Sequence, residues 1–227
     1  MKTLIAIGGG SFQKQETRAI DMYAIARCGK SKPRVLFLPL ASRDDQGYAK
    51  RFKQYYRSLG CEVEALRLLH TKLHIEEIYD TFRRQDMIYL GAGDTTFLME
   101  QLQSRKLDLL LHELADLGIV ICGLSAGANV LFEYGYSNIA TDRYDIVNGT
   151  GLIKGAFCPH YQKQERKAFD TIYLKPGLQR ICCKDNQAYV VEDEKAFFAG
   201  MKMPSPFSFD SFSTSNSGKN YLQIVSF

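Results

Sequence analysis

Short apolar runs and amphipathic segments alternate along the first half of the chain. Five apolar or strictly alternating segments predict β-strands at residues 3–7, 34–38, 62–68, 87–90 and 119–122. The segments between them have helical periodicity and predict helices at residues 17–28, 45–59 and 75–84, and one or two helices at 96–117. Strands that alternate with helices favour an α/β fold, with a mostly parallel sheet flanked by helices.

The pattern changes beyond Gly135. Helices are predicted at residues 126–133 and 163–174, a hairpin at 188–191 and 196–199, and a last strand at 221–225. No linker, repeat or low-complexity segment interrupts the chain. We therefore expect a single domain over residues 1–227, with an antiparallel extension at its C-terminal end.

Composition narrows the class of protein. The 227 residues are 45% hydrophobic and 24% charged, and the net charge of +4 is spread out, which does not favour nucleic-acid binding. The N-terminal apolar run is too short for a signal peptide, and no window approaches a membrane span. Six cysteines lack the spacing of a zinc site or a redox pair, so we expect free thiols, no metal and a cytoplasmic location.

The strongest chemical signal is the segment at residues 123–129, Gly-Leu-Ser-Ala-Gly-Ala-Asn, which directly follows a predicted strand. Gly-x-Ser-x-Gly between a strand and a helix is typical of a nucleophile elbow, where the glycines permit a sharp turn and close helix packing. Ser125 would stand at a helix N-terminus, which favours the negative charge of a tetrahedral intermediate.

A serine nucleophile needs a base, and the chain has four histidines. His70 and His74 lie in a polar connection, and His112 lies within a predicted helix. His160 follows the apolar segment 156–159 and precedes a predicted helix, which places it in a loop at a strand end. The pattern favours His160 as the base, with a capping or packing role as the alternative.

The sequence pattern alone does not identify the carboxylate that would orient such a base. Five carboxylates follow the elbow at suitable places, namely Asp142, Asp145, Glu192, Asp193 and Glu194. A carboxylate at the end of the predicted strand 188–191 is well placed to reach a histidine on a neighbouring loop, but the same residues also fit an ordinary hairpin turn.

Two glycine-rich loops also follow predicted strands. In the loop 91–95, Gly-Ala-Gly-Asp-Thr, small residues such as Gly91 let the backbone approach a ligand, and Asp94 is a candidate substrate contact or helix cap. The loop 8–10 lacks the third spaced glycine of a dinucleotide site, so no cofactor is expected. Because ligands bind beyond the carboxyl ends of parallel strands, we expect these loops and the elbow to meet there.

Together, the elbow at 123–129, the loop at 91–95 and the segment Cys158-Pro159-His160-Tyr161 resemble the dipeptidase E and cyanophycinase family of serine peptidases. The resemblance implies a class I glutamine amidotransferase-like (flavodoxin-like) fold without a cofactor. It also implies Ser125 as nucleophile, His160 as base, and Glu192, or alternatively Asp193, as the third member. The N–H groups of Gly93 and Ala126 would form the oxyanion hole.

The family's preference for aspartyl substrates requires cations near the site. Lys163 and Arg166 are the candidates, although exposed charges at a helix start are an equal interpretation. The resemblance thus predicts a serine exopeptidase for small peptides, as a monomer or homodimer. The alternatives are an esterase or amidase on the same elbow, and an inactive relative that binds a ligand in the same pocket.

Overall fold

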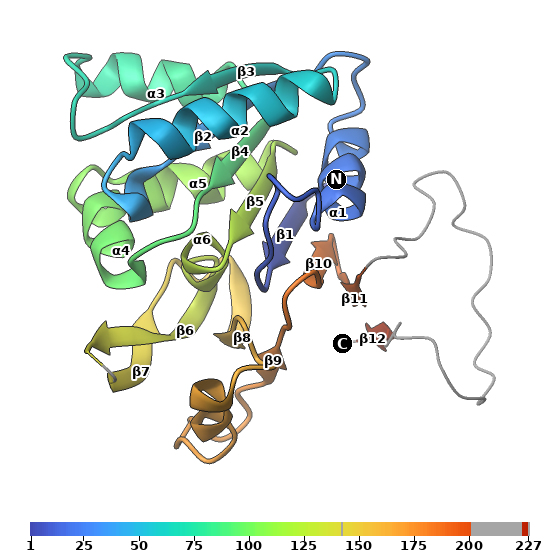
Figure 1. The fold of residues 1–227 in the computed structure, drawn as a ribbon, viewed down its shortest axis with the longest axis vertical. Coiled ribbons are helices and arrows are strands. Elements are labelled where there is room, and N and C mark those ends of the chain that lie inside the picture. Colours follow the sequence, from blue (N-terminus) through green and yellow to red (C-terminus); the bar gives the residue numbers. More distant parts are fainter. Residues whose placement is uncertain (142, 201–223, 227) are drawn as a thin grey trace.

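The computed structural model describes residues 1–141, 143–200 and 224–226. Within these residues an eight-stranded sheet has the order β12-β11-β10-β1-β5-β4-β2-β3 (Figure 1). Its parallel part, which confirms the expected α/β class, comprises β1 (Thr3–Ile7), β2 (Arg34–Leu38), β3 (Glu62–Ala65), β4 (Met87–Leu90) and β5 (Val120–Leu124).

The C-terminal part of the sheet is antiparallel, as expected. The predicted hairpin forms as β10 (Ala188–Glu192) and β11 (Lys195–Ala199), and β10 pairs antiparallel with β1. The strand predicted at 221–225 falls partly outside the described residues, and β12 (Ile224–Ser226) pairs with β11. The first strand of the chain therefore lies inside the sheet, between β5 and β10.

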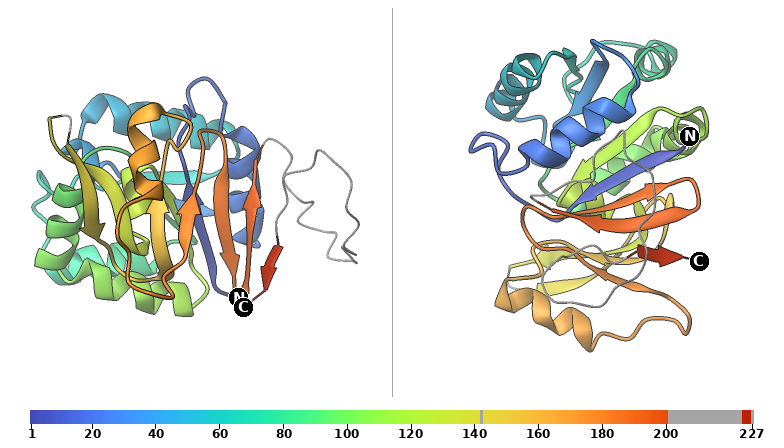
Figure 2. Two further views of the ribbon diagram at one scale, coloured as in Figure 1. Left: turned by 90° about the horizontal axis from the view of Figure 1, so that it is seen from below. Right: turned by 90° about the vertical axis from the view of Figure 1, so that its right-hand side faces the viewer.

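Helices cover both faces of the sheet because side chains alternate along each strand. Val35, Phe37 and Tyr89 pack on one face with α1 (Arg18–Arg27) and α2 (Gln46–Ser58). Leu36, Leu38 and Ile88 pack on the other face with three helices, α3 (Ile75–Arg83), α4 (Thr95–Ser104) and α5 (Leu107–Asp116) (Figure 2). Both faces are buried, which explains why these strands appear in the sequence as continuous apolar runs.

A second sheet follows the elbow and lies beside α6 and β10 in Figure 1. Among the described residues it has the order β7-β6-β8-β9, with β6 (Phe132–Ala140), β7 (Arg143–Asn148), β8 (Ile153–Cys158) and β9 (Arg180–Cys182). The predicted helix 126–133 is wrong beyond α6 (Ala126–Asn129). Phe132 instead pairs with β8 and stacks on Phe157 at 4.6 Å, so tertiary packing overrides helical periodicity.

The helix predicted at 163–174 is also shorter in the structure, which has the 3-10 helix η2 (Gln164–Asp170). None of the helices in the described ranges combines the length and apolar character needed to cross a membrane.

Helix α6 lies against β4 because Gly127 has no side chain. A Cβ at Gly127 would lie 2.1 Å from the carbonyl oxygen of Leu90, which is far inside van der Waals contact. The second glycine of the elbow therefore fixes the distance between the helix and the sheet.

Gly127→Ala should lower the free energy of unfolding by about 3 kcal/mol, because either α6 or β4 must move to admit the methyl group. Gly47→Ala is the matched control in α2, where the nearest atom to the new Cβ belongs to the flexible Arg51 side chain. It should change stability by less than about 1 kcal/mol. Urea unfolding of both variants measures this, and equal losses would contradict the proposed packing constraint.

Candidate active site

Ser125 lies at the sharp turn between β5 and α6, as the elbow predicts. Its backbone has φ 53° and ψ −103°, a conformation that residues with a side chain rarely adopt. The Ser125 N–H donates to the carbonyl oxygen of Ile7 at 2.9 Å, and its own carbonyl accepts from Asn129 N–H at 2.9 Å. A Cβ at Gly123 would lie 2.2 Å from the Gly127 carbonyl oxygen, so this tight turn also requires glycine there.

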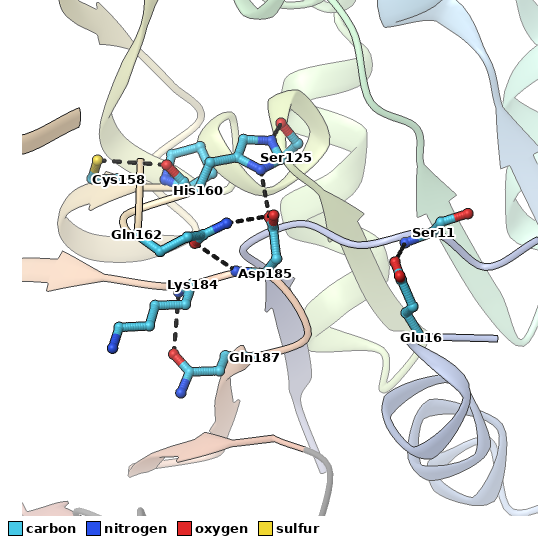
Figure 3. A network of polar contacts seen from close by, with 10 residues as sticks. Ser11, Glu16, Ser125, Cys158, His160, Gln162, Lys184, Asp185 and Gln187 are labelled. Atoms are coloured by element: carbon cyan, nitrogen blue, oxygen red, sulfur yellow. Dashed lines mark hydrogen bonds and ion pairs between the residues drawn. The ribbon is translucent and has the colours of Figure 1, made fainter. Parts of the chain in front are cut away.

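A chain of hydrogen bonds starts at the Ser125 hydroxyl (Figure 3). Ser125 Oγ is 2.8 Å from His160 Nε2, and His160 Nδ1 is 2.5 Å from Asp185 Oδ1. The other Asp185 oxygen accepts from the Gln162 side-chain amide, whose oxygen in turn accepts from the Asp185 N–H at 2.9 Å. Both ring nitrogens of His160 are thus engaged, and the carboxylate that orients the ring is itself held in place.

His160 follows β8 and adopts a left-handed backbone, with φ 54°. Its N–H donates to the carbonyl oxygen of Gly8 at 2.9 Å. Asp185 lies in the loop between β9 and β10, where the next residue, Asn186, donates its N–H to the Gly9 carbonyl oxygen at 3.0 Å. The loop after β1 therefore anchors both segments.

Gly9 has a steric role that its sequence pattern did not indicate. A Cβ at this position would lie 1.8 Å from Asp185 Oδ1 and 2.5 Å from His160 Nδ1. The glycines that follow β1 therefore make room for the histidine–carboxylate pair.

Burial lowers the pKa of His160 below its ordinary value of 6.5, and the hydrogen bond and charge of Asp185 oppose this effect. The imidazole is therefore neutral at neutral pH. With Nδ1–H donating to the carboxylate, the Nε2 lone pair faces the Ser125 hydroxyl.

The expected acid, Glu192, is elsewhere, and this is a correction to the sequence-based assignment. Glu192 is buried, with Oε1 2.5 Å from Arg27 Nε and 2.7 Å from the Tyr23 hydroxyl that donates to it. Its alternative, Asp193, accepts from the Lys2 N–H at 2.8 Å. Neither lies on His160.

The reason is the direction of β10. It runs antiparallel to β1, so Ala188 pairs with Ile7 and Glu192 pairs with Thr3. The end of β10 therefore lies at the amino end of β1, away from Ser125, whereas Asp185 precedes β10 at the correct end. Of the other candidates, Asp145 lies beside Arg143, Glu194 is exposed, and Asp142 is outside the described residues.

A pocket of about 340 Å³ opens beside Ser125. It is lined by Gly93, Asp94, Thr95, Ser125, Asn129, Ser137, Asn138, Pro159 and Arg166. Gly93 has φ 146°, and a Cβ there would lie 2.1 Å from the Ala41 carbonyl oxygen, so this loop also requires glycine. Ala126 is the first residue of α6, where an N–H has no intrahelical acceptor.

Arg166 is a buried cation in this pocket, with only 9% of its surface exposed. One guanidinium nitrogen donates to the Tyr136 carbonyl oxygen at 2.8 Å, and the group stacks 4.4 Å over the Tyr144 ring. Its Nε is buried without a hydrogen-bond partner, and within the described ranges no carboxylate forms an ion pair with it.

The other expected substrate contacts differ in position. Asp94 lines the pocket, where it caps α4 by accepting from the Phe97 N–H at 3.0 Å. Gly91 is buried at the start of the loop and does not line the pocket. Lys163 is exposed and does not line the pocket either. Across the described residues, no three His, Cys, Asp or Glu side chains are grouped so as to hold a metal ion.

Comparison with known proteins gives a consistent result. The model of peptidase family S51 matches residues 4–199. The chain is 34% identical to an uncharacterized peptidase of Bacillus subtilis, YgaJ, over 74% of both chains. It is 35% identical to a probable alpha-aspartyl dipeptidase of Drosophila melanogaster, over 78% of this chain and 76% of that one.

Among solved structures, a peptidase from an acI-B1 Actinobacterium superposes with a TM-score of 0.70, at 20% identity and over 88% of each chain. This likeness supports the expected class I glutamine amidotransferase-like fold. Because the family model spans nearly all of the described chain and the relatives agree with it, this protein belongs to peptidase family S51 and is a serine peptidase.

Proposed function

We propose that the protein is an exopeptidase that removes an acidic N-terminal residue from small peptides through a Ser125–His160–Asp185 triad. The observation that carries this proposal is the continuous hydrogen-bonded chain from the Ser125 hydroxyl to the Asp185 carboxylate. This chain has the geometry that an activated serine nucleophile needs, since a base lies on the hydroxyl and an acid orients the base.

In the acylation step, Ser125 Oγ attacks the peptide carbonyl carbon while His160 Nε2 takes the hydroxyl proton. Asp185 stabilises the imidazolium that forms. The N–H groups of Gly93 and Ala126 bind the developing oxyanion, helped by the positive end of α6. His160 then gives its proton to the leaving amine as the C–N bond breaks.

Deacylation repeats these roles with water. His160 takes a proton from a water molecule, whose oxygen attacks the acyl carbon of the ester on Ser125. The tetrahedral intermediate collapses, Ser125 regains the proton from His160, and the acidic residue leaves as a free amino acid.

The substrate class follows from the charges of the pocket. A buried guanidinium without an ion-pair partner is costly, and a substrate carboxylate would supply the missing acceptor at Arg166. Asp94 places the opposite charge at the same pocket, where it can attract the free α-ammonium group of an N-terminal residue. The relative named as a probable alpha-aspartyl dipeptidase agrees with this class.

The test is a panel of dipeptides with Asp, Glu, Asn or Ala at the N-terminus. The wild type should cleave those with Asp or Glu at least tenfold faster, in kcat/KM, than those with Asn or Ala. Ser125→Ala should lower turnover by about 10⁴-fold or more. Release of free amino acid, followed by chromatography, measures both quantities.

Arg166→Gln tests whether Arg166 causes the preference for a negatively charged N-terminal side chain. It should reduce the ratio between Asp and Asn substrates and leave the folded structure detectable by circular dichroism. Turnover that survives Ser125→Ala, or a wild type that cleaves none of the peptides, would contradict the proposed function.

A matched pair of variants distinguishes the roles of Asp185 and Glu192. Asp185→Asn should lower kcat by about 10⁴-fold, because an amide does not hold the required tautomer of His160. Glu192→Gln should keep kcat within a few-fold of the wild type. Its cost should instead be about 3 kcal/mol of stability, because it leaves Arg27 in a broken buried pair. Steady-state kinetics and urea unfolding give both numbers, and the reverse pattern would restore Glu192 as the orienting acid.

The dependence of kcat/KM on pH should reflect the titration of His160. Activity requires the neutral imidazole, so kcat/KM should fall as pH falls through the pKa of His160. Because burial lowers this pKa, the midpoint should lie below pH 6.5. In Asp185→Asn the residual activity should have its midpoint at still lower pH, since the carboxylate raises the pKa. A midpoint that moves upward in this variant would be inconsistent with the contact.

A further inference from the structure

A second pocket adjoins the first and is not used by the triad. It has a volume of about 570 Å³ and shares Asp94 and Asn138 with the pocket beside Ser125. Its walls are the N-terminal half of α4 on one side and the β6–β7 hairpin on the other. A ligand held at Ser125 can therefore continue into this space.

Half of the residues that line the second pocket are apolar and half are polar or charged. The apolar lining residues are Phe97, Ile139, Ala140, Ile146 and Val147. The register of the hairpin identifies Val147 as a residue directed toward α4. It pairs with Gly135, and Ser137, two residues along on the same face, bonds the Thr95 hydroxyl at 2.8 Å.

The polar lining residues of the second pocket are Arg43, Asp94, Thr96, Glu100 and Asn138. Arg43 lies 4.1 Å over the Phe97 ring and 3.6 Å from Asp94, where the two pockets meet. The Thr96 hydroxyl is buried next to the pocket without a hydrogen-bond partner. The pocket therefore combines an apolar part, formed by Phe97 and the β6–β7 hairpin, with charged groups that include the Arg43–Asp94 pair and Glu100.

We propose that this second pocket binds the side chain of the residue that follows the scissile bond, and that it selects large apolar side chains there. The proposal rests on the proposed function. With an N-terminal acidic residue in the first pocket, only the leaving part of the substrate remains to fill the adjoining space. The preferred substrates are thus peptides with an acidic residue followed by an aliphatic or aromatic one.

The test compares Asp-Leu, Asp-Gly and Asp-Lys dipeptides. Burial of a leucine side chain should raise kcat/KM for Asp-Leu by about tenfold to a hundredfold over Asp-Gly. Asp-Lys should stay below Asp-Leu, although Glu100 lines the pocket, because burial of the apolar side chain is the selected feature. The affinities of Asp-Leu and Asp-Gly for the Ser125→Ala variant, measured by calorimetry, should differ in the same direction.

Val147→Asp should reduce the Asp-Leu to Asp-Gly ratio at least fivefold by placing a charge on the apolar wall. Leu109→Asp is the matched control, since Leu109 is 64% exposed on α5 and lines neither pocket. It should keep the wild-type ratio. Val147→Trp, which fills the pocket without adding charge, gives a second variant that should also reduce the ratio.

Equal rates for Asp-Leu and Asp-Gly in the wild type would overturn the apolar subsite while leaving the peptidase intact. A ratio unchanged in both Val147 variants would do the same. Cleavage of none of the peptides would instead overturn the proposed function, and the subsite with it.

Discussion

Three successive carbonyl groups at the end of β1 hold the candidate active site together. Ile7 accepts the N–H of Ser125, Gly8 accepts that of His160, and Gly9 accepts that of Asn186, next to Asp185. Backbone hydrogen bonds are short and directional, so these contacts fix three distant segments to one rigid strand. The hydroxyl, the ring and the carboxylate meet because their backbones share this template.

The sequence predicted those parts of the site that depend on local patterns, and it missed those that depend on contacts with β1. The strands, the helices between them and the elbow depend on local patterns, and these predictions were accurate for β1, β5 and the Ser125 turn. The position of Asp185 could not be predicted, because it depends on a long-range contact, the antiparallel pairing of β10 with β1. As a result, the residues that precede β10, and not those that follow it, lie near Ser125. The pattern of apolar and polar residues does not indicate that β10 pairs with β1 or in which direction it runs. The second sheet was missed for a similar reason, because Phe132 follows a short helix and finds its partner only at β8.

Two deeply buried charged side chains, Glu192 and Arg166, differ in their partners. Glu192, which is deeply buried, has Arg27 as a close partner, as expected for a carboxylate removed from water. Arg166 is buried to a similar degree but holds only a backbone carbonyl and an aromatic face. A buried cation without a counter-ion beside Ser125 supports the proposal that Arg166 binds a substrate carboxylate.

The position of β1 also bears on how the chain assembles during synthesis. The end of β1 precedes the segments that it holds, which follow at residues 125, 160 and 185. Contacts across such separations form late, because the intervening chain must be ordered first. The candidate active site therefore cannot be complete in a nascent chain that lacks the residues up to β10. If the proposed triad carries the activity, a chain built in this order stays inert toward other peptides until nearly its whole sheet is complete.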